Sequence, residues 1–559
     1  MGWLCLLFLL FTTCQFNSTF SSSSNSSSSL SSGHLCHPHD SSALLQFKNS
    51  FSIDTSSHEV ESFNGPTLYS NSTITWQKGK DCCAWSGVTC EKMTGHVIGL
   101  NLHFGGLQGN IHSNSSLFSL GHLKRLDLSK NDFRGSPILS KFGGFVSMTH
   151  LDLSFSNFNG PIPSEISHLS NLVSLNLSLR DVRLDTLSFN RIVQNLTNLQ
   201  ELQLDGVDMS SVVPDSFKNL SSSLKTLTLI DCHFFVGSYP ALPGNLTQIM
   251  ELDLSSNSFG GQIPWSLFLN LVSLVVLDLS DNNYVGSLPS LEGLYLRSNQ
   301  SGNIIEFQSR SLKILFLNDN KLHGLIPRSI FELENLQYLD LSSNNLSGTV
   351  KFEKFSKLQS LFSLDLSSNH LSLSFNHLSN NSWPQLFDLA LSSCNISEFP
   401  YFLRASPNLD RLNLSYNRIQ GEVPKWLWDV AKDSLYYLDL SHNFLKGTAR
   451  HLRWKNLGYL NLRNNSLQGE LPIPSPSTFF FSISNNQLTG EMPPTICSLS
   501  SLQILDLSNN KLSGKIHQCI GNFSQSLSVL DLRNNKFHGM IPRTFSKGND
   551  MRNLDLNGN

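Results

Sequence analysis

The chain has 559 residues, a formal net charge of −3 and only 14% charged residues. This charge excludes both the basic field of a nucleic-acid-binding protein and an acidic tail that would attract a cationic partner. The length suggests several domains, unless the chain is built from repeats, which form one elongated body of any length.

The N-terminus begins with the sequence MGWLCLLFLLFTTC. Its apolar run, residues 3–11, is too short to span a bilayer and suits the hydrophobic region of a signal peptide. A Ser-rich stretch follows and is typical of a disordered leader, so we assign residues 1–24 to the signal peptide and the start of this leader. No second apolar run of about 18 residues occurs, so no membrane anchor is predicted in the chain as written.

Asn-x-Ser/Thr sequences and eight cysteines beyond the signal peptide predict passage through the secretory pathway, where disulfides form and glycans are added. The candidate glycosylation sites are Asn71, Asn114, Asn195, Asn219, Asn245, Asn345, Asn395, Asn464 and Asn522.

Residues 34–92 form a predicted N-terminal cap that contains four cysteines: Cys36, Cys82, Cys83 and Cys90. Two adjacent cysteines cannot easily bond each other without strain, so each needs another partner. A disulfide-linked cap is favoured over a zinc or redox site, because the context is secretory and no histidines fall at zinc spacing. His37 and His39 are predicted to be exposed in a loop.

Within this cap the sequence SSALLQFKNSF predicts a short amphipathic helix packed on the body that follows. Its apolar residues are Leu44, Leu45, Phe47 and Phe51.

From residue 97 to residue 559 the pattern LxxLxL recurs, mostly at intervals of 21 to 27 residues. Its central leucine stands at 126, 151, 175, 202, 227, 252, 277, 294, 315, 339, 364, 389, 412, 438, 460, 505, 530 and 554, with Phe481 filling the gap before 505. This period is that of the leucine-rich repeat, and about twenty copies are present, the last one incomplete.

The pattern predicts an α/β solenoid: a right-handed superhelix with a parallel sheet on its concave face. Leucines that alternate with polar residues place a short strand in each repeat, with leucine facing inward. The asparagine after each strand, as in Asn131, Asn257 and Asn510, is predicted to be buried and to bond turn backbone, which is a structural role. The following LxGxIP segment and a short 3-10 or loop return form the convex side.

One step, from Leu277 to Leu294, is only 17 residues long. Two explanations stay open: a repeat with a thin convex side, or an error at a splice junction in the gene prediction. Among the later cysteines, Cys497 and Cys519 lie on adjacent outer segments and are predicted to form a disulfide. Cys232 and Cys394 stand in the asparagine position of their repeats and are predicted to be buried free thiols.

No catalytic motif is present, and the aspartates recur with the repeat, so neither an enzyme nor a cofactor or metal site is expected. The concave face is predicted to bind a ligand where outward residues depart from the consensus LDLSxN. These candidates are Arg180, Gln203, Asp205, Thr228, Asp231, Tyr295, Arg297, Phe316 and Asn318. Glycans on Asn176 or Asn413 would block this face, whereas Asn299 is predicted to be buried and unmodified.

The motifs ALLQFK, DCCAWSGVTC and TGHVIGLNL, followed by repeats of LxxLxLxxNxLxGxIPxxLxxLxx, resemble the plant leucine-rich-repeat receptor-like proteins. They look similar to the leaf-mould resistance class of tomato, and the resemblance covers nearly everything after the signal peptide. It implies a plasma-membrane glycoprotein that faces the apoplast, with one transmembrane helix and a short tail without a kinase. It also implies disulfides Cys36–Cys82 and Cys83–Cys90.

By this resemblance the protein binds microbial or endogenous protein or peptide ligands, in immunity or in development, and signals with a partner leucine-rich-repeat receptor kinase. The chain departs from the family by lacking the C-terminal cap, the transmembrane helix and the tail. Two alternatives are therefore kept: a secreted inhibitor of cell-wall-degrading enzymes, similar to polygalacturonase inhibitors, and a truncated decoy that does not signal.

The last nine residues, MRNLDLNGN, repeat the start of a unit and stop before its outer segment. Met551, Leu554 and Leu556 are predicted to face inward, and Asn559 takes the asparagine position. The sequence thus predicts a C-terminally truncated member of the family, because a solenoid end without a cap exposes core and strand edge.

Overall fold

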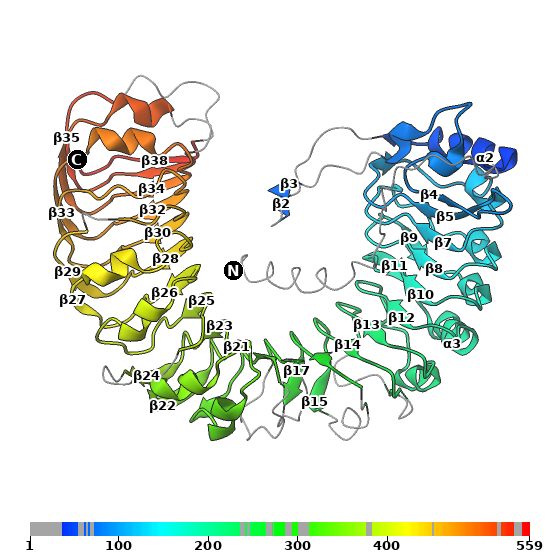
Figure 1. Ribbon diagram of the computed structural model, residues 1–559, viewed down its shortest axis with the longest axis horizontal. Helices are drawn as coiled ribbons and strands as arrows, with labels where there is room; N and C mark the ends of the chain where they lie inside the picture. The colour runs from blue at the N-terminus through cyan, green and yellow to red at the C-terminus, as the bar shows by residue number, and fades with distance from the viewer. Residues whose placement is uncertain are drawn as a thin grey trace, which may run out of the picture.

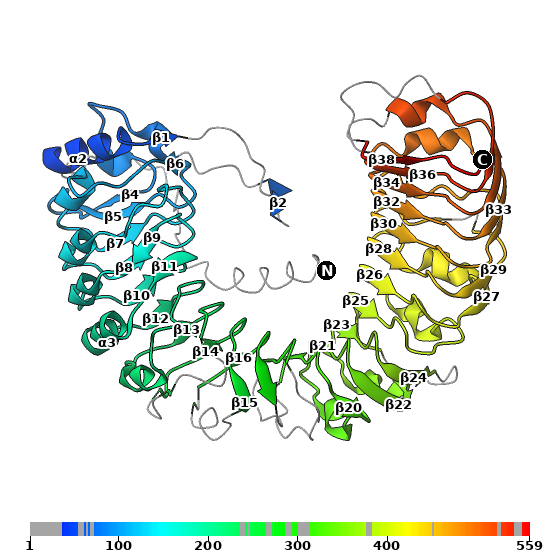
Figure 2. The ribbon, with the colours of Figure 1, turned by 180° about the vertical axis from the view of Figure 1, so that it is seen from behind.

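The computed structural model describes residues 36–53, 61–62, 65–66, 72–234, 241–242, 246–263, 271, 273–285, 293–299, 312–375, 383–449, 452–522, 527–541 and 551–559. The chain winds into an open horseshoe whose inner wall is a ribbon of short strands (Figures 1 and 2). The predicted signal peptide and the candidate glycosylation sites Asn71 and Asn245 lie outside the described residues.

The inner wall is one sheet of 21 strands in the described part of the chain. The first, β4 (Val88–Cys90), is antiparallel to β5, and the others run parallel in chain order. The parallel strands are β5 (Val97–Asn101), β7 (Arg125–Asp127), β8 (His150–Asp152), β10 (Ser174–Asn176), β12 (Glu201–Gln203), β13 (Thr226–Thr228), β14 (Glu251–Asp253), β16 (Val276–Asp278), β18 (Gly293–Tyr295), β19 (Ile314–Phe316), β21 (Tyr338–Asp340), β23 (Ser363–Asp365), β25 (Asp388–Ala390), β26 (Arg411–Asn413), β28 (Tyr437–Asp439), β30 (Tyr459–Asn461), β32 (Phe480–Ser482), β34 (Ile504–Asp506), β36 (Val529–Asp531) and β38 (Asn553–Asp555).

The register of this sheet follows the leucine pattern. Leu126 pairs with Leu100 on one side and Leu151 on the other. Phe481, in the degenerate repeat, pairs with Leu460 and Leu505 in the same way. The predicted solenoid of leucine-rich repeats is confirmed, because every repeat places its central apolar residue opposite that of its neighbours.

Asparagines hold the turn after most strands of the inner sheet. The amide of Asn257 donates to the carbonyl oxygens of Leu229, Leu254 and Ser255 at 2.7, 3.1 and 2.9 Å. Its Oδ1 accepts the backbone N–H of Cys232 at 2.9 Å. One side chain thus bonds two successive repeats, and we call the row of such residues the asparagine ladder. The predicted structural role of asparagine is confirmed.

Two cysteines take the same position. Cys232 and Cys394 are buried free thiols, as predicted. Their Sγ atoms lie 3.2 and 3.5 Å from the carbonyl oxygens of Leu204 and Leu366, which a ladder amide would otherwise bond. Burial raises the pKa of both thiols, so they remain protonated donors.

Short 3-10 helices and one α-helix return the chain along the convex side. They are η3 (Ser116–Ser119), η4 (Ser140–Gly144), η5 (Ser164–His168), α3 (Thr186–Asn195), η6 (Pro214–Asn219), η7 (Arg328–Glu332), η8 (Phe352–Lys357), η9 (Tyr401–Ala405), η10 (Lys425–Asp429), η11 (Pro494–Ser498) and η12 (Gln518–Asn522). Pro163 and Pro327 are the residues before η5 and η7, so the proline of LxGxIP begins the return segment.

A second set of short strands, which the sequence did not predict, pairs the LxGx segments of adjacent repeats. It comprises β9 (Asn159–Pro161) with β11 (Asp181–Arg183), β15 (Gly260–Gln262) with β17 (Asn283–Val285), β20 (His323–Gly324) with β22 (Asn345–Lys351) and β24 (His370–Ser374), β27 (Gln420–Glu422) with β29 (Phe444–Lys446), and β31 (Gln468–Gly469) with β33 (Gln487–Glu491), β35 (Lys511–Gly514) and β37 (Lys536–Phe537). These strands join neighbouring repeats on the outer side of the core.

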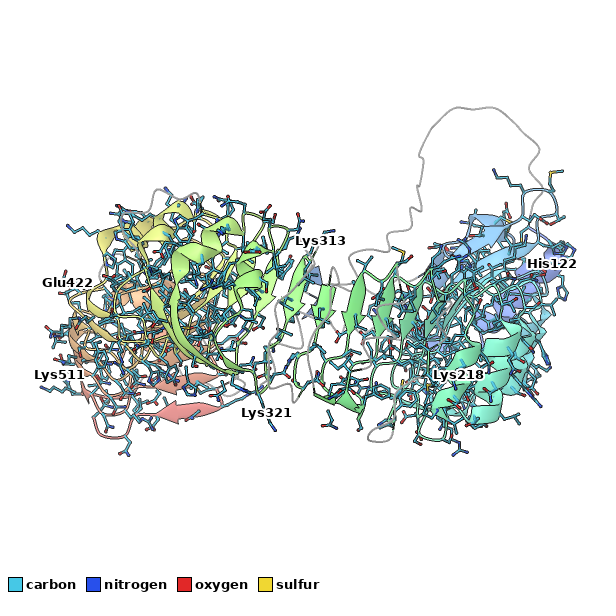
Figure 3. The ribbon with its side chains drawn as sticks, turned by 90° about the horizontal axis from the view of Figure 1, so that it is seen from below. His122, Lys218, Lys313, Lys321, Glu422 and Lys511 are labelled. Atoms are coloured by element: carbon cyan, nitrogen blue, oxygen red, sulfur yellow. A yellow bond between two sulfur atoms is a disulfide. The ribbon has the colours of Figure 1, made fainter. Side chains whose placement is uncertain are left out.

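The short step between Leu277 and Leu294 does not interrupt the inner sheet, since these two residues pair directly. Residues 286–292, where a thin convex side was predicted, lie outside the described residues. Figure 3 shows the arch from below, with Lys313 at one border of the band and Lys321 at the other, so that β19 and its turn cross the width of the band.

The N-terminal cap closes the first repeat. Helix α2 (Pro38–Lys48) buries Leu44 and Phe47 against the first repeats, as predicted, together with Ala43. Of the other two predicted residues, Leu45 is partly buried, and Phe51 packs on the core from beyond the end of the helix. The antiparallel strand β4 covers the edge of β5. The remaining cap elements are β1 (Ser52–Ile53) paired with β6 (Leu107–Gln108), β2 (Glu61–Ser62) paired with β3 (Gly65–Pro66), η1 (Ser72–Thr75) and η2 (Cys82–Ala84).

Three disulfides join cysteines among the described residues. The cap contains Cys36–Cys82 and Cys83–Cys90, the two links that the family resemblance implies. A third, Cys497–Cys519, joins the outer segments of two adjacent repeats. Within the cap, the indole rings of Trp76 and Trp85 stack with centroids 5.5 Å apart. Among the described residues, none of the helices combines the length and apolar character needed to cross a bilayer.

The C-terminal strand follows the predicted register. Asn559 donates to the carbonyl oxygens of Leu532 and Leu556, both at 2.9 Å, so it completes the asparagine ladder. Leu554 is 40% exposed, whereas the equivalent Leu530 of the preceding strand is 1% exposed.

Candidate ligand-recognition surface

The concave face presents the outward residues of the strands, on either side of each central leucine. In eight of the described repeats the residue after the leucine is an aspartate whose carboxylate accepts the backbone N–H of the serine two residues later. At Asp253 and Asp278 this distance is 2.9 and 2.8 Å. These carboxylates cap the ends of the strands, so their recurrence is structural rather than catalytic.

Burial alters the acidity of this row of carboxyls. It raises the pKa of Asp152 to about 6, that of Asp278 to about 7 and that of Asp340 to about 8. Repulsion from Asp127 adds to the increase at Asp152, and repulsion from Asp365 adds to that at Asp340. The arch of the horseshoe therefore presents partly protonated carboxyls near neutral pH.

The C-terminal arm carries a different set of outward residues. Tyr437, Tyr459 and Phe480 occupy the same register position on β28, β30 and β32, just before the central apolar residue. Their rings stack with centroids 4.2 Å apart at each step and with planes 8° and 10° from parallel. All three side chains are half-buried. We call these three residues the aromatic stack.

A charged pair continues the aromatic stack toward β25. The guanidinium carbon of Arg411 lies 4.2 Å from the centroid of Tyr437, a cation–π distance. Arg411 Nε lies 3.7 Å from Asp388 Oδ1, a buried oxygen that accepts no hydrogen bond. Burial raises the pKa of Asp388 to about 7, and Arg411 opposes this increase. Arg411 therefore contacts both the Tyr437 ring and the buried carboxyl of Asp388.

Further aromatic side chains border this surface. Phe362 and Phe387 stack with centroids 4.8 Å apart and are 39% and 38% exposed. At the other ends of the strands, Tyr416 and His442 stack with centroids 3.9 Å apart. Both residues of this second pair have left-handed backbone, with φ of 53° and 54°. Aromatic surface therefore lies just before β23 and β25 on one side of the sheet and just after β26 and β28 on the other.

The sequence prediction missed the aromatic stack, although the sequence contained a signal for it. The tyrosines and the phenylalanine precede the central apolar residue in YYLDL, GYLNL and FFFSI. An aromatic residue in the same register of successive repeats would have indicated a stack across the sheet.

The nine predicted ligand contacts differ in how much of their surface is exposed. Three of them expose little surface: Thr228 at 8%, Tyr295 at 8% and Asn318 at 3%. They do not fit the prediction of exposed outward contacts, because neighbouring strands cover them. Tyr295 packs its ring edge against Phe316 with centroids 5.1 Å apart, and burial raises its pKa. Tyr295 thus belongs partly to the packing of the sheet.

The other predicted contacts are more accessible and lie apart from the aromatic stack. Arg180 and Asp231 are exposed. The half-buried residues are Gln203, Asp205, Arg297 and Phe316. Asp205 Oδ1 accepts the backbone N–H of Ile230 at 3.1 Å, and Arg297 Nε lies 3.4 Å from Asp319 Oδ2. Each of these two charged groups is already paired within the sheet.

The described glycosylation candidates differ in their exposure and in their place in the repeat. Asn114, Asn195, Asn219, Asn345 and Asn395 are exposed. Asn464 is half-buried and bonds the ring of His442, while the side chain of Asn522 lies outside the described residues. Asn299 is in the asparagine ladder, where it donates to Leu279 at 2.8 Å. Asn176 and Asn413 lie mid-strand on the concave face, in the register predicted for them.

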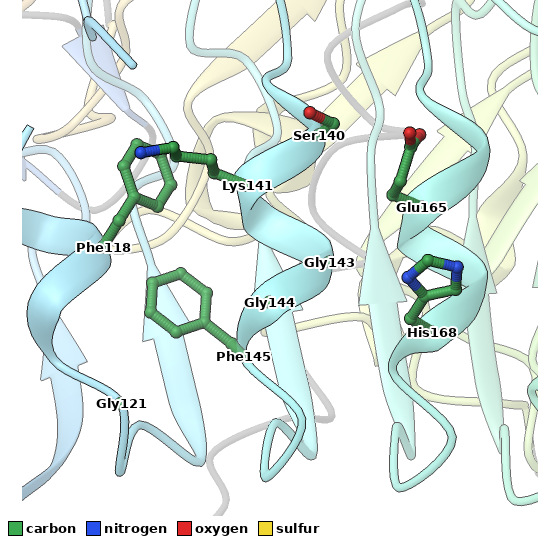
Figure 4. A pocket seen from close by; sticks show the side chains of 9 residues that line it. All are labelled: Phe118, Gly121, Ser140, Lys141, Gly143, Gly144, Phe145, Glu165 and His168. Carbon is green, nitrogen blue, oxygen red and sulfur yellow. The ribbon is translucent and has the colours of Figure 1, made fainter. Parts of the chain in front are cut away.

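A broad depression of about 470 Å³ lies on the convex side, among η3, η4 and η5 (Figure 4). Phe118, Lys141 and Phe145 form one wall, and Glu165 and His168 form the other. The ammonium of Lys141 lies 6.0 Å from the Phe118 centroid.

Family comparisons agree with this architecture. Residues 37–91 match the leucine rich repeat N-terminal domain, and residues 310–371 match a leucine rich repeat model. Single Leucine Rich Repeat models match residues 147–169, 248–270, 408–430, 479–499, 501–523 and 526–547. The chain is therefore a leucine-rich-repeat protein with its own N-terminal cap.

Comparison with curated proteins shows which leucine-rich-repeat proteins this chain is similar to. Receptor-like protein 6 of Arabidopsis thaliana is 32% identical over 92% of this chain. Receptor-like protein Cf-9 of Solanum pimpinellifolium is 40% identical over 40% of this chain and 26% of its own length. The chain belongs to the plant leucine-rich-repeat receptor-like proteins. It spans 62% of the length of Receptor-like protein 6.

Among solved structures, the chain is similar to the Arabidopsis receptor kinase HAESA in complex with the peptide hormone IDA and the co-receptor SERK1. The TM-score is 0.53 at 25% sequence identity, over 93% of this chain and 94% of that one. The described horseshoe is thus a plant receptor ectodomain fold.

Proposed function

We propose that this chain is the extracellular ligand-recognition part of a plant cell-surface receptor without a kinase. In this proposal it binds a protein or peptide ligand on its concave face and acts by binding rather than by catalysis. The observation that carries the proposal is the aromatic stack beside Arg411 and Asp388. Tyrosine and arginine, which dominate binding energy at protein interfaces, here lie side by side on an open surface.

The shape of this surface favours an extended ligand. Strands in a sheet are about 4.8 Å apart, so the three strands of the aromatic stack extend over roughly 10 Å and the two strands before them add a similar length. A peptide lying across the strands would place apolar side chains on the rings.

Partners and location follow from the relatives as proposals. HAESA is described with a peptide hormone and a co-receptor, and we propose that this chain likewise signals through a leucine-rich-repeat receptor kinase. We propose the plasma membrane, facing the apoplast, as the location of the full-length protein. The similarity to Cf-9 favours a role in disease resistance over one in development.

The experiment starts from the secreted chain immobilised on a support. Apoplastic fluid from inoculated and mock-treated leaves is passed over wild type and over a Tyr459→Ala/Phe480→Ala variant, and the retained peptides are identified by mass spectrometry. Each candidate peptide is then synthesised and its Kd measured by calorimetry. We expect the double variant to bind about 30-fold more weakly, which corresponds to roughly 2 kcal/mol.

Phe444→Ala is the matched control, because Phe444 is 58% exposed on β29, outside the concave sheet. Equal binding by the double variant would remove the aromatic stack as the site. Potent inhibition of a fungal polygalacturonase by the secreted chain would instead favour the inhibitor alternative. Ligand binding without any association with a receptor kinase would favour a decoy.

A further inference from the structure

Three histidines and one buried aspartate meet in the N-terminal cap. His37 and Asp40 belong to the start of α2, whereas His96 precedes β5, 56 residues after Asp40. His96 Nδ1 lies 3.1 Å from Asp40 Oδ2, and His37 Nδ1 lies 3.9 Å from Asp40 Oδ1. The His37 and His96 rings stack with centroids 4.2 Å apart, and His122 stacks on the other side of His96 at 4.1 Å.

The burial of this cluster is uneven. The side chain of Asp40 is only 4% exposed, and that of His96 is 23% exposed. Asp40 Oδ2 also accepts the backbone N–H of Val97 at 2.9 Å. His37 keeps 42% of its side chain exposed, yet its Nδ1 atom is buried and has no hydrogen-bond partner. A buried ring nitrogen without a partner is costly, so it indicates a missing contact.

We propose that His37, Asp40 and His96 bind one divalent transition-metal ion of the zinc type. Their three ligand atoms lie within 4.8 Å of one another. Zinc binds histidine nitrogen and carboxylate oxygen at about 2.0–2.2 Å in tetrahedral geometry, which places the ligand atoms roughly 3.3–3.6 Å apart. His96 Nδ1 lies 3.1 Å from Asp40 Oδ2 and His37 Nδ1 lies 3.9 Å from Asp40 Oδ1, so metal binding would require side-chain rotations that separate the stacked His37 and His96 rings.

Imidazole and carboxylate are the ligands that zinc-type ions prefer, and the exposed edge of His37 leaves a fourth position for water. Both histidines would bind through Nδ1 as neutral rings that carry their proton on Nε2, so metal ligation would replace the contact between His96 Nδ1 and Asp40 Oδ2. The cap cysteines cannot compete for the ion, because all four are joined in disulfides.

Such an ion would tie the cap helix to the first repeat. Two ligands come from α2 and the third from the residue before β5, so metal binding would add a second link next to the Cys36–Cys82 disulfide. His122 is at the end of the N-terminal arm (Figure 3), on the side of His96 away from His37, and takes no part in ligation. The cap would then be ordered by both disulfide and metal.

The test uses the full secreted chain without a polyhistidine tag, after treatment with a chelator. Zn²⁺ is titrated by calorimetry, and Co²⁺ is followed by the visible absorption of its four-coordinate state. We expect one Zn²⁺ per chain and at least a tenfold loss of affinity in His37→Ala and in His96→Ala. His37→Ala is the stronger test, because its half-exposed side chain can be removed without opening the core.

Two controls separate ligation from ring stacking and from general histidine binding. His122→Ala removes a stacked ring but no ligand, and His168→Ala removes a histidine on the distant η5 helix. Both variants are expected to keep the wild-type affinity and the wild-type Co²⁺ spectrum. No zinc binding by the wild type, or the same affinity in wild type and folded His37→Ala, would overturn the proposal.

Discussion

The two arms of the horseshoe share one core but differ in the outward residues that they present on the concave face. On the N-terminal arm the residues just before the central leucines are polar or charged, as at Arg125, His150 and Glu201. On the C-terminal arm the same position carries the aromatic stack. Identical pairing geometry therefore supports two chemistries, because outward side chains are free of the constraints that fix the inward ones.

The largest effect is expected where the arms are alike, in the asparagine ladder. Asn131→Ala and Asn510→Ala should each cost about 2–4 kcal/mol of unfolding free energy, since each leaves three carbonyl oxygens and one N–H without their side-chain partner. Denaturant unfolding and hydrogen exchange of the flanking repeats would measure the loss. Because Cys232 and Cys394 occupy this position in their repeats, Asn510→Cys should lower the unfolding free energy less than Asn510→Ala does. A marked difference between the losses for Asn131→Ala and Asn510→Ala would show that the scaffolds of the two arms are not equivalent.

Ligand binding should distinguish the arms. Truncating Tyr459 and Phe480 is expected to weaken binding about 30-fold, whereas His150→Ala with Glu201→Ala should change it less than about threefold. Calorimetric titration of the same peptide into both double variants would compare them. Stronger loss in the N-terminal variant would move the site to the other arm.

The arch between the arms should give the protein a pH-dependent stability. Burial raises the folded pKa of Asp278 to about 7 and that of Asp340 to about 8, above the ordinary value of 3.8. The folded state thus holds protons that the unfolded chain releases, so stability is highest at acidic pH and falls as pH rises from about 4 to about 8. We expect Tm to be a few degrees higher at pH 5 than at pH 8.

Asp278→Asn with Asp340→Asn should flatten this pH profile, because both positions then stay neutral at every pH. Thermal unfolding followed by circular dichroism at pH 5 and pH 8 would measure it. An unchanged slope in the double variant would assign the pH dependence to other groups.

The smallest expected effect is a difference in glycosylation between sites on the outside of the repeats and sites on the concave face. Glycopeptide mass spectrometry is expected to find Asn114 and Asn195 modified, since both are exposed on the outside of the repeats. Asn299 should be unmodified because it is 5% exposed within the asparagine ladder. Asn413 should also be unmodified, since its Oδ1 accepts the N–H of Ser415 at 3.0 Å. A glycan at Asn413 would cover β26 beside Arg411 and would exclude the proposed site.

The sequence alone determined the solenoid, its register and its asparagine ladder. A repeat that alternates leucine with polar residues can bury its apolar face only by stacking on its neighbours, so the positions of Leu126 and Asn257 already define strand and turn. The cap helix and the cysteine pairing implied by the resemblance also agree with the structure. The outer strands were not foreseen, because the LxGx segment carries no alternating pattern.

The tertiary structure alone decided which outward side chains are accessible and which meet. The repeat spacing shows that the side chains of Tyr295 and Thr228 point away from the core. In the folded sheet both side chains are nevertheless buried. The contact of His96 with Asp40 likewise arises only when the cap folds back on the first repeat. Periodicity dictates the direction of a side chain, whereas its neighbours across the sheet depend on how residues distant in sequence are brought together.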